Sequence, residues 1–162
     1  MLTIKKIIVH IDGSSQGNPG PSGIGVNCET GDGKKISEIS KYIGFGTNNQ
    51  AEYKALIEAL RMLGTKYLNQ EIGKNPKIII KTDSELLCNQ VNGLYKIKDF
   101  SLRKLFSEVD KLKKALPEIT AELIPREENR ICDRLAKKSI KTAMKSGVAA
   151  KPKTVKVQTL FS

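Results

Sequence analysis

The stretch IKKIIVHIDGSSQGNPGPSG, residues 4–23, joins an apolar run to a segment of glycine, serine, asparagine and proline. A run of β-branched residues is typical of a strand that is buried on both faces. Residues 4–12 therefore predict a first strand, and residues 13–23 predict a loop, because glycine and proline interrupt regular structure. Asp12 stands at the carboxyl end of the predicted strand, where the apolar run stops.

Two more strands are predicted after this loop, over residues 23–29 and 35–45, where β-branched and aromatic side chains recur. The sequence Thr-Gly-Asp-Gly at residues 30–33 separates them and is typical of a hairpin turn. The first three strands are therefore expected to be consecutive and antiparallel.

The hydrophobic period then changes to helical spacing, with Thr47, Asn48 and Asn49 as candidate capping residues. The rest of the chain predicts a helix over 50–68, a strand over 77–82, two helical segments between 83 and 116, a strand over 119–124 and a basic helix over 127–147. Helices between the later strands allow strands one, four and five to lie parallel through right-handed crossovers. We therefore expect an α/β fold with a five-stranded mixed sheet, in which strands 1–3 are antiparallel, strands 1-4-5 are parallel, and helices flank the sheet.

Composition narrows the class of protein. The 28 lysines and arginines exceed the 17 acidic residues, giving a net charge of +11, which favours a polyanionic partner such as nucleic acid. Lysine-rich surfaces also serve solubility, so charge alone does not decide whether the partner is nucleic acid.

The three cysteines are far apart, which disfavours a zinc site and predicts small buried thiols in a cytoplasmic protein. No stretch approaches the ~20 apolar residues of a membrane span, so no membrane association is expected.

Four acidic residues occupy informative places on this map. Asp12 and Asp83 follow two strands that are expected to be parallel neighbours, and sites form at that edge of α/β sheets. Glu52 and Asp133 lie in the first turns of two helices that can pack against the same edge. For any one of them, a helix cap or dipole partner is the plainer interpretation. Together they predict a site for two Mg²⁺ or Mn²⁺ ions, because hard cations relieve carboxylate repulsion and can clamp a phosphodiester.

The motifs around these acids occur in a fixed order: IDGSSQGNPGPSG, TNNQAEY, TDSELL and REENRICDRLA. Together they resemble the type 1 ribonuclease H family, over nearly the whole chain. The resemblance implies the ribonuclease H-like fold and an endonuclease that hydrolyses the RNA strand of RNA–DNA hybrids with two metal ions, leaving 5′-phosphate and 3′-hydroxyl ends. By motif, it assigns both catalysis and metal binding to Asp12, Glu52, Asp83 and Asp133.

The resemblance also implies substrate contacts. Asn18, Asn48 and Asn49 would read the minor groove of the hybrid, since an amide both donates and accepts and suits a 2′-hydroxyl. Gly13 would let the backbone approach that groove closely, and Thr47 would contact a phosphate of the DNA strand. A turn for Asn18 and a helix cap for Asn48 are alternatives that need not exclude binding.

Two departures from the family's pattern bear on function. Many members have a catalytic histidine before the last helix, where this chain reads LIPREEN, so Arg126 or Glu127 would take over part of its work. His10, the one histidine, is expected to be a packed core residue. The basic, tryptophan-bearing protrusion of some members is expected to be absent, since the chain has no Trp. Binding would then depend on scattered lysines and on the last helix, with a solvated face as the alternative interpretation of its lysines Lys137, Lys138, Lys141 and Lys145. Members without it sometimes also cleave double-stranded RNA, so that substrate stays open.

The expected organisation is a catalytic domain over residues 1–146 and a basic tail over 147–162, in a monomer. Within the tail, QTLF partly resembles sliding-clamp peptides but lacks their full spacing, so disorder or packing on the domain is favoured over a clamp as partner. Two other functions remain open. One is a duplex-binding module without turnover, and the other is a DNA-processing enzyme such as an integrase or junction resolvase.

Overall fold

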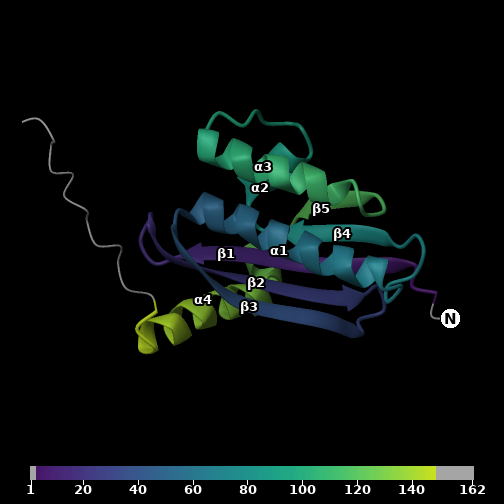
Figure 1. Cartoon of the computed structure of the whole chain (residues 1–162), viewed down its shortest axis with the longest axis horizontal. Helices are drawn as coiled ribbons and strands as arrows, with labels where there is room; N and C mark the ends of the chain where they lie inside the picture. Colours follow the sequence, from purple (N-terminus) through teal and green to yellow (C-terminus); the bar gives the residue numbers. More distant parts are fainter. Residues whose placement is uncertain (1–2, 149–162) are drawn as a thin grey trace, which may run out of the picture.

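The strands of this protein form one mixed sheet in the order β3-β2-β1-β4-β5, seen in a computed structural model that describes residues 3–148 (Figure 1). The strands are β1 (Lys6–Ser15), β2 (Gly20–Thr30), β3 (Lys35–Gly46), β4 (Lys77–Thr82) and β5 (Ile119–Leu123). The helices are α1 (Asn48–Leu68), α2 (Glu85–Val91), α3 (Phe100–Lys113) and α4 (Arg130–Lys145), with a short 3₁₀ turn, η1 (Arg126–Glu128), before α4. The expected element order and fold class are confirmed.

Strand pairing follows the predicted pattern. β1 pairs antiparallel with β2, and β2 pairs antiparallel with β3. β4 pairs in parallel with both β1 and β5. Opposite faces of the sheet carry α1 and α4, and α3 lies beside α1 (Figure 1). The core between the sheet and α1 is built from fully buried side chains such as Ile7, Val9, Leu60 and Leu63.

The predicted loop over residues 13–23 is wrong at both ends. β1 continues to Ser15 and β2 already begins at Gly20, so only residues 16–19 connect them. The glycines in these strands serve close packing rather than a turn. A Cβ on Gly25 would lie 2.2 Å from the carbonyl oxygen of Cys132, and one on Gly23 would lie 2.6 Å from that of Ala136. α4 therefore rests directly on the β2 backbone.

Helix boundaries also depart slightly from the sequence prediction. The last helix begins at Arg130 instead of residue 127, because Glu127 and Glu128 form the 3₁₀ turn and Asn129 follows it. α1 begins at Asn48 with Thr47 as its N-cap.

The three cysteines are buried free thiols, as expected. No helix of the described part is long and apolar enough to cross a membrane. The expected basic tail falls almost entirely outside the described residues.

Candidate active site

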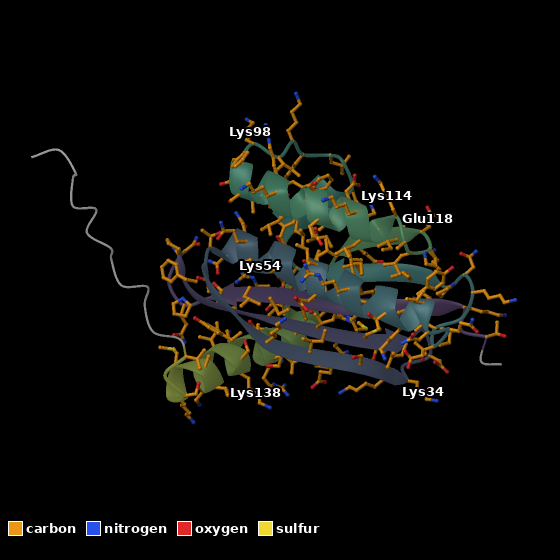
Figure 2. The ribbon with its side chains drawn as sticks, in the orientation of Figure 1. Lys34, Lys54, Lys98, Lys114, Glu118 and Lys138 are labelled. Carbon is orange, nitrogen blue, oxygen red and sulfur yellow. The ribbon has the colours of Figure 1, made fainter. Side chains whose placement is uncertain are left out.

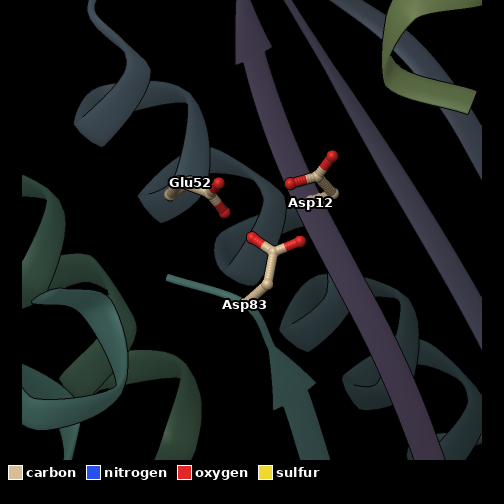
Figure 3. Close-up of side chains that lie close together, drawn as sticks. All are labelled: Asp12, Glu52 and Asp83. Atoms are coloured by element: carbon tan, nitrogen blue, oxygen red, sulfur yellow. The ribbon is translucent and has the colours of Figure 1, made fainter. Parts of the chain in front are cut away.

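Three of the four predicted acids converge at the carboxyl edge of the sheet. In the parallel register of β1 and β4, His10 stands opposite Lys81, so Asp12 and Asp83 each lie two residues beyond the same pair. Glu52 reaches them from the second turn of α1, and Figure 3 shows the three carboxyl groups pointing toward one another. Asp12, Glu52 and Asp83 each offer an oxygen within 4.8 Å of the other two. The sequence prediction for these three residues describes one real cluster.

Burial makes this cluster electrostatically costly. Asp12 is only 5% exposed and Glu52 only 8%. Burial first, and then the charge of Asp83, raises the pKa of Asp12 to about 7. Burial and the charges of Asp12 and Asp83 raise the pKa of Glu52 well above its usual range. Glu52 Oε2 is also buried with no hydrogen-bond partner among residues 3–148.

This donor set fits a hard divalent cation. Each member supplies carboxylate oxygen, the ligand that Mg²⁺ and Mn²⁺ favour. An unpaired buried oxygen is rare in folded proteins and indicates a missing partner. A cation would satisfy Glu52 Oε2 and remove the repulsion that raises the two pKa values. Asp12, Glu52 and Asp83 could therefore hold such an ion.

Asp133 lies in the same cleft but outside the tight cluster. The cleft has a volume of about 560 Å³, and Asp12, Asp83 and Asp133 all line it. The side chain of Asp133 is 45% exposed. Its Oδ2 accepts a hydrogen bond of 3.0 Å from Lys137 Nζ, and the two form an ion pair one helical turn apart on α4. Its negative charge still contributes to the raised pKa of Asp12.

Two of the three predicted asparagines, Asn18 and Asn48, are joined by a hydrogen bond at the start of α1. The backbone N–H of Asn48 donates to Asn18 Oδ1 at 3.0 Å, and Ser15 N–H donates to Asn48 Oδ1 at 3.1 Å. Both side-chain oxygens are thus engaged within the protein, which leaves the two NH₂ groups as donors. Asn48 and Asn49 line the cleft.

Gly13 has a structural role that the sequence did not assign to it, whereas Thr47 has the capping role that its position predicted. A Cβ on Gly13 would lie 2.2 Å from the backbone of Ala51, so glycine is required where β1 meets α1. Gly13 nevertheless lines the cleft as well. Thr47 Oγ1 accepts from Gln50 N–H, while Gln50 Oε1 accepts from Thr47 N–H, which completes a capping box. The cap fixes the turn that carries Asn48 and Asn49.

Several cleft residues were missed by the sequence prediction of site residues. Arg126 was predicted and lines the cleft, but Arg130 and Lys137 line it too. Arg130 was not predicted, whereas Lys137 belongs to the run of lysines on the last helix that the sequence offered as a binding surface, and it lies four residues after Asp133. Asn129 is 1% exposed, and its Nδ2 donates both to Asp83 Oδ2 at 3.2 Å and to the Ile11 carbonyl at 2.8 Å. It therefore ties the start of α4 to the acid cluster.

His10 is half-buried on β1, two residues before Asp12. Burial, followed by the charge of Lys81, lowers its pKa. Its Nδ1 is buried without a partner in the described part of the chain. The imidazole thus occupies the sheet next to the cluster and does not line the cleft.

Comparisons with known proteins agree with this geometry. A family model described as reverse transcriptase-like matches residues 10–139. Ribonuclease HI of Helicobacter pylori is 33% identical over 83% of this chain and 92% of its own length. A bifunctional protein of Mycobacterium tuberculosis is 34% identical over 89% of this chain, which spans only 38% of that relative's length.

Solved structures show the same fold. LC11-RNase H1, crystallised in complex with an RNA/DNA hybrid, has a TM-score of 0.80 and 38% identity, and the match covers 86% of this chain and 99% of that one. RNase H1 of the archaeon Halobacterium salinarum has a TM-score of 0.77 and 32% identity, covering 85% and 99%. With a ribonuclease HI covered almost from end to end and a sheet of the same topology, the chain belongs to the type 1 ribonuclease H family.

Proposed function

We propose that this protein is an endonuclease that hydrolyses the RNA strand of RNA–DNA hybrids, leaving 5′-phosphate and 3′-hydroxyl ends. The main support for this function is the largely buried cluster of Asp12, Glu52 and Asp83, each of which offers an oxygen within 4.8 Å of the other two. The ribonuclease HI relatives and the hybrid-bound LC11-RNase H1 support the choice of substrate.

Two divalent ions, Mg²⁺ or Mn²⁺, are the proposed cofactors, held by the cluster together with Asp133. Such ions, when bound, supply Lewis-acid activation of water and neutralise charge on the phosphate. Asp12 and Glu52 contribute the fixed, buried part of the site. The more exposed Asp133, which is paired with Lys137, would complete the set of carboxylate ligands. Asn129 keeps Asp83 aimed at the cluster through its 3.2 Å hydrogen bond.

The substrate is proposed to lie across the start of α1. The free NH₂ groups of Asn18, Asn48 and Asn49 face acceptors in the minor groove, which are base edges and 2′-oxygens. Gly13 lets the protein backbone approach the minor groove closely, and Thr47 contacts a phosphate of the DNA strand. Arg126 carries positive charge at the rim of the cleft, where a phosphate or the 5′-phosphate product would lie.

One assay tests this proposal and separates its alternatives. Labelled RNA–DNA hybrid, duplex RNA and duplex DNA are each incubated with the protein and Mg²⁺ or Mn²⁺. We expect cleavage of the RNA strand of the hybrid, and loss of at least nine-tenths of it in Asp83→Asn. Binding of hybrid without cleavage by the unaltered protein would instead indicate a binding module. Preferred cleavage of duplex DNA would indicate a DNA-processing enzyme, and cleavage of duplex RNA would extend the substrate range.

The catalytic domain is proposed to span residues 1–146, acting as a cytoplasmic monomer. The partial resemblance of QTLF to sliding-clamp peptides falls on residues outside the described range.

A further inference from the structure

α4 carries an unusual concentration of positive charge on its solvent face. All six of its basic side chains are exposed, and its only acid is Asp133. The six residues are Arg130, Arg134, Lys137, Lys138, Lys141 and Lys145. Apart from the adjacent Lys137 and Lys138, they follow one another at intervals of three or four residues, which places them along one side of the helix. We call this set the α4 stripe.

Five of the six residues of the α4 stripe form no ion pair in the described part of the chain. Of the six residues, only Lys137 forms an ion pair within residues 3–148, and its partner is Asp133. Elsewhere the surface mixes the two signs, as where Glu58 pairs with both Lys41 and Arg61. A helix face that only needs to be soluble usually places glutamate among its lysines, because like charges at such spacing destabilise a helix. The stripe therefore carries a repulsion that an anionic partner would relieve.

The buried face of α4 fixes the stripe in place. Cys132, Leu135, Ala136 and Ile140 are buried against the sheet, where Gly25 allows backbone contact. The stripe also begins inside the proposed active site, since Arg130 and Lys137 line the cleft with the acids. From Arg130 to Lys145 it extends about 22 Å at the helical rise per residue, which equals about six base pairs of duplex.

We propose that the α4 stripe binds the phosphate backbone of the hybrid where the duplex continues beyond the cleft. This inference rests on the proposed function. Charge complementarity and continuity with the cleft favour nucleic acid over an acidic membrane surface. On α4 the exposed apolar side chains, Ile131 and Met144, lie toward its two ends instead of forming a face along it.

The test uses the outer part of the stripe, which does not line the cleft. Lys138→Gln, Lys141→Gln and Lys145→Gln are combined in a full-length Asp12→Asn background, so that hybrid is bound without being cut. The matched control is Lys34→Gln, Lys74→Gln and Lys77→Gln, which removes the same charge at the opposite end of the molecule. Figure 2 shows Lys138 on α4 and Lys34 far from it. Circular dichroism melting verifies that all three proteins fold.

Hybrid affinity is measured by fluorescence anisotropy at several salt concentrations, with a long hybrid and with one whose duplex ends at the cleft. Each lost phosphate contact lowers the slope of log affinity against log salt by about 0.9, so the stripe variant should lose about 2.7 on the long hybrid. Between about 50 and 200 mM salt, the parent then loses about forty-fold more affinity than the variant. The short hybrid and the control should show the parental slope.

Two results would overturn the proposal. Equal slope changes in the stripe variant and the control would show only a general effect of net charge. An unchanged slope in the stripe variant would exclude phosphate contact. If the variant with an unchanged slope also loses binding to anionic phosphatidylserine vesicles, the stripe would be assigned to membranes. If the Asp12→Asn parent binds neither hybrid, the proposed function itself fails, which is a distinguishable outcome.

Discussion

Replacing Asp12 with asparagine should stabilise the metal-free protein while abolishing its activity. The pKa of Asp12 is about 7 in the folded protein, against 3.8 for an unperturbed aspartate side chain. Because the folded state binds this proton more tightly, Asp12 supports folding below about pH 4 and progressively loses that contribution up to about pH 7. The difference corresponds to about 4 kcal/mol at pH 8. Asparagine removes the charge but still buries a polar group, so we expect a gain of about 2–4 kcal/mol.

The assay is thermal unfolding followed by circular dichroism at pH 8 in EDTA. For a domain of this size the gain corresponds to a rise in melting temperature of about 5–15 °C. Asp110→Asn removes one negative charge from an exposed position on α3 and serves as the matched control, with little change expected. Melting of Asp12→Asn at or below the temperature of the unaltered protein under these conditions would contradict the raised pKa of Asp12. With Mg²⁺ in excess, the difference between the two proteins should shrink, because a cation relieves the same repulsion.

Three further outcomes follow from described contacts. In EDTA, the melting temperature of the unaltered protein should fall as pH rises from about 4 to 8, and a flat profile would contradict the raised pKa of Asp12 and Glu52. Gly25→Ala should cost more than about 2 kcal/mol in urea unfolding, because its Cβ would overlap Cys132, whereas Gly64→Ala has open space in α1 and should be neutral or stabilising. Asn48→Asp keeps the acceptor for Ser15 N–H but loses the NH₂ donor, so hybrid binding should weaken at least about tenfold without loss of stability, and Asn75→Asp should bind normally.

The topology was predictable because each element carries its own signal. The order of strands and helices follows from local signals without tertiary information. These signals are the apolar run ending in Asp12, the capping residues that begin at Thr47 and the apolar strand before Asp83. The same signals place Asp12 and Asp83 at one sheet edge, since parallel neighbours end together. Three of the four acids are adjacent as the sequence predicts.

What could not be predicted depends on contacts between distant segments. Glycines near residues 13–23 look like loop residues in sequence, yet Gly13 and Gly23 lie in strands because α1 and α4 approach the backbone there. The internal use of the Asn48 oxygen depends on Ser15, 33 residues earlier. No local pattern reveals that Asn129 bridges Asp83 and the Ile11 carbonyl.

The glycine contacts on the two faces of the sheet have a consequence for motion. Gly13 brings α1 onto β1, and Gly25, the partner of Asp12 in the β1–β2 register, brings α4 onto β2. Amide protons of β1 around Asp12 should therefore exchange with solvent only when the whole domain unfolds. The three residues of η1 are exposed, so its amides should exchange through local opening. Slow exchange around Asp12 beside fast exchange at η1 would therefore distinguish two walls of the same cleft, one tied to the core and one, holding Arg126, that opens locally.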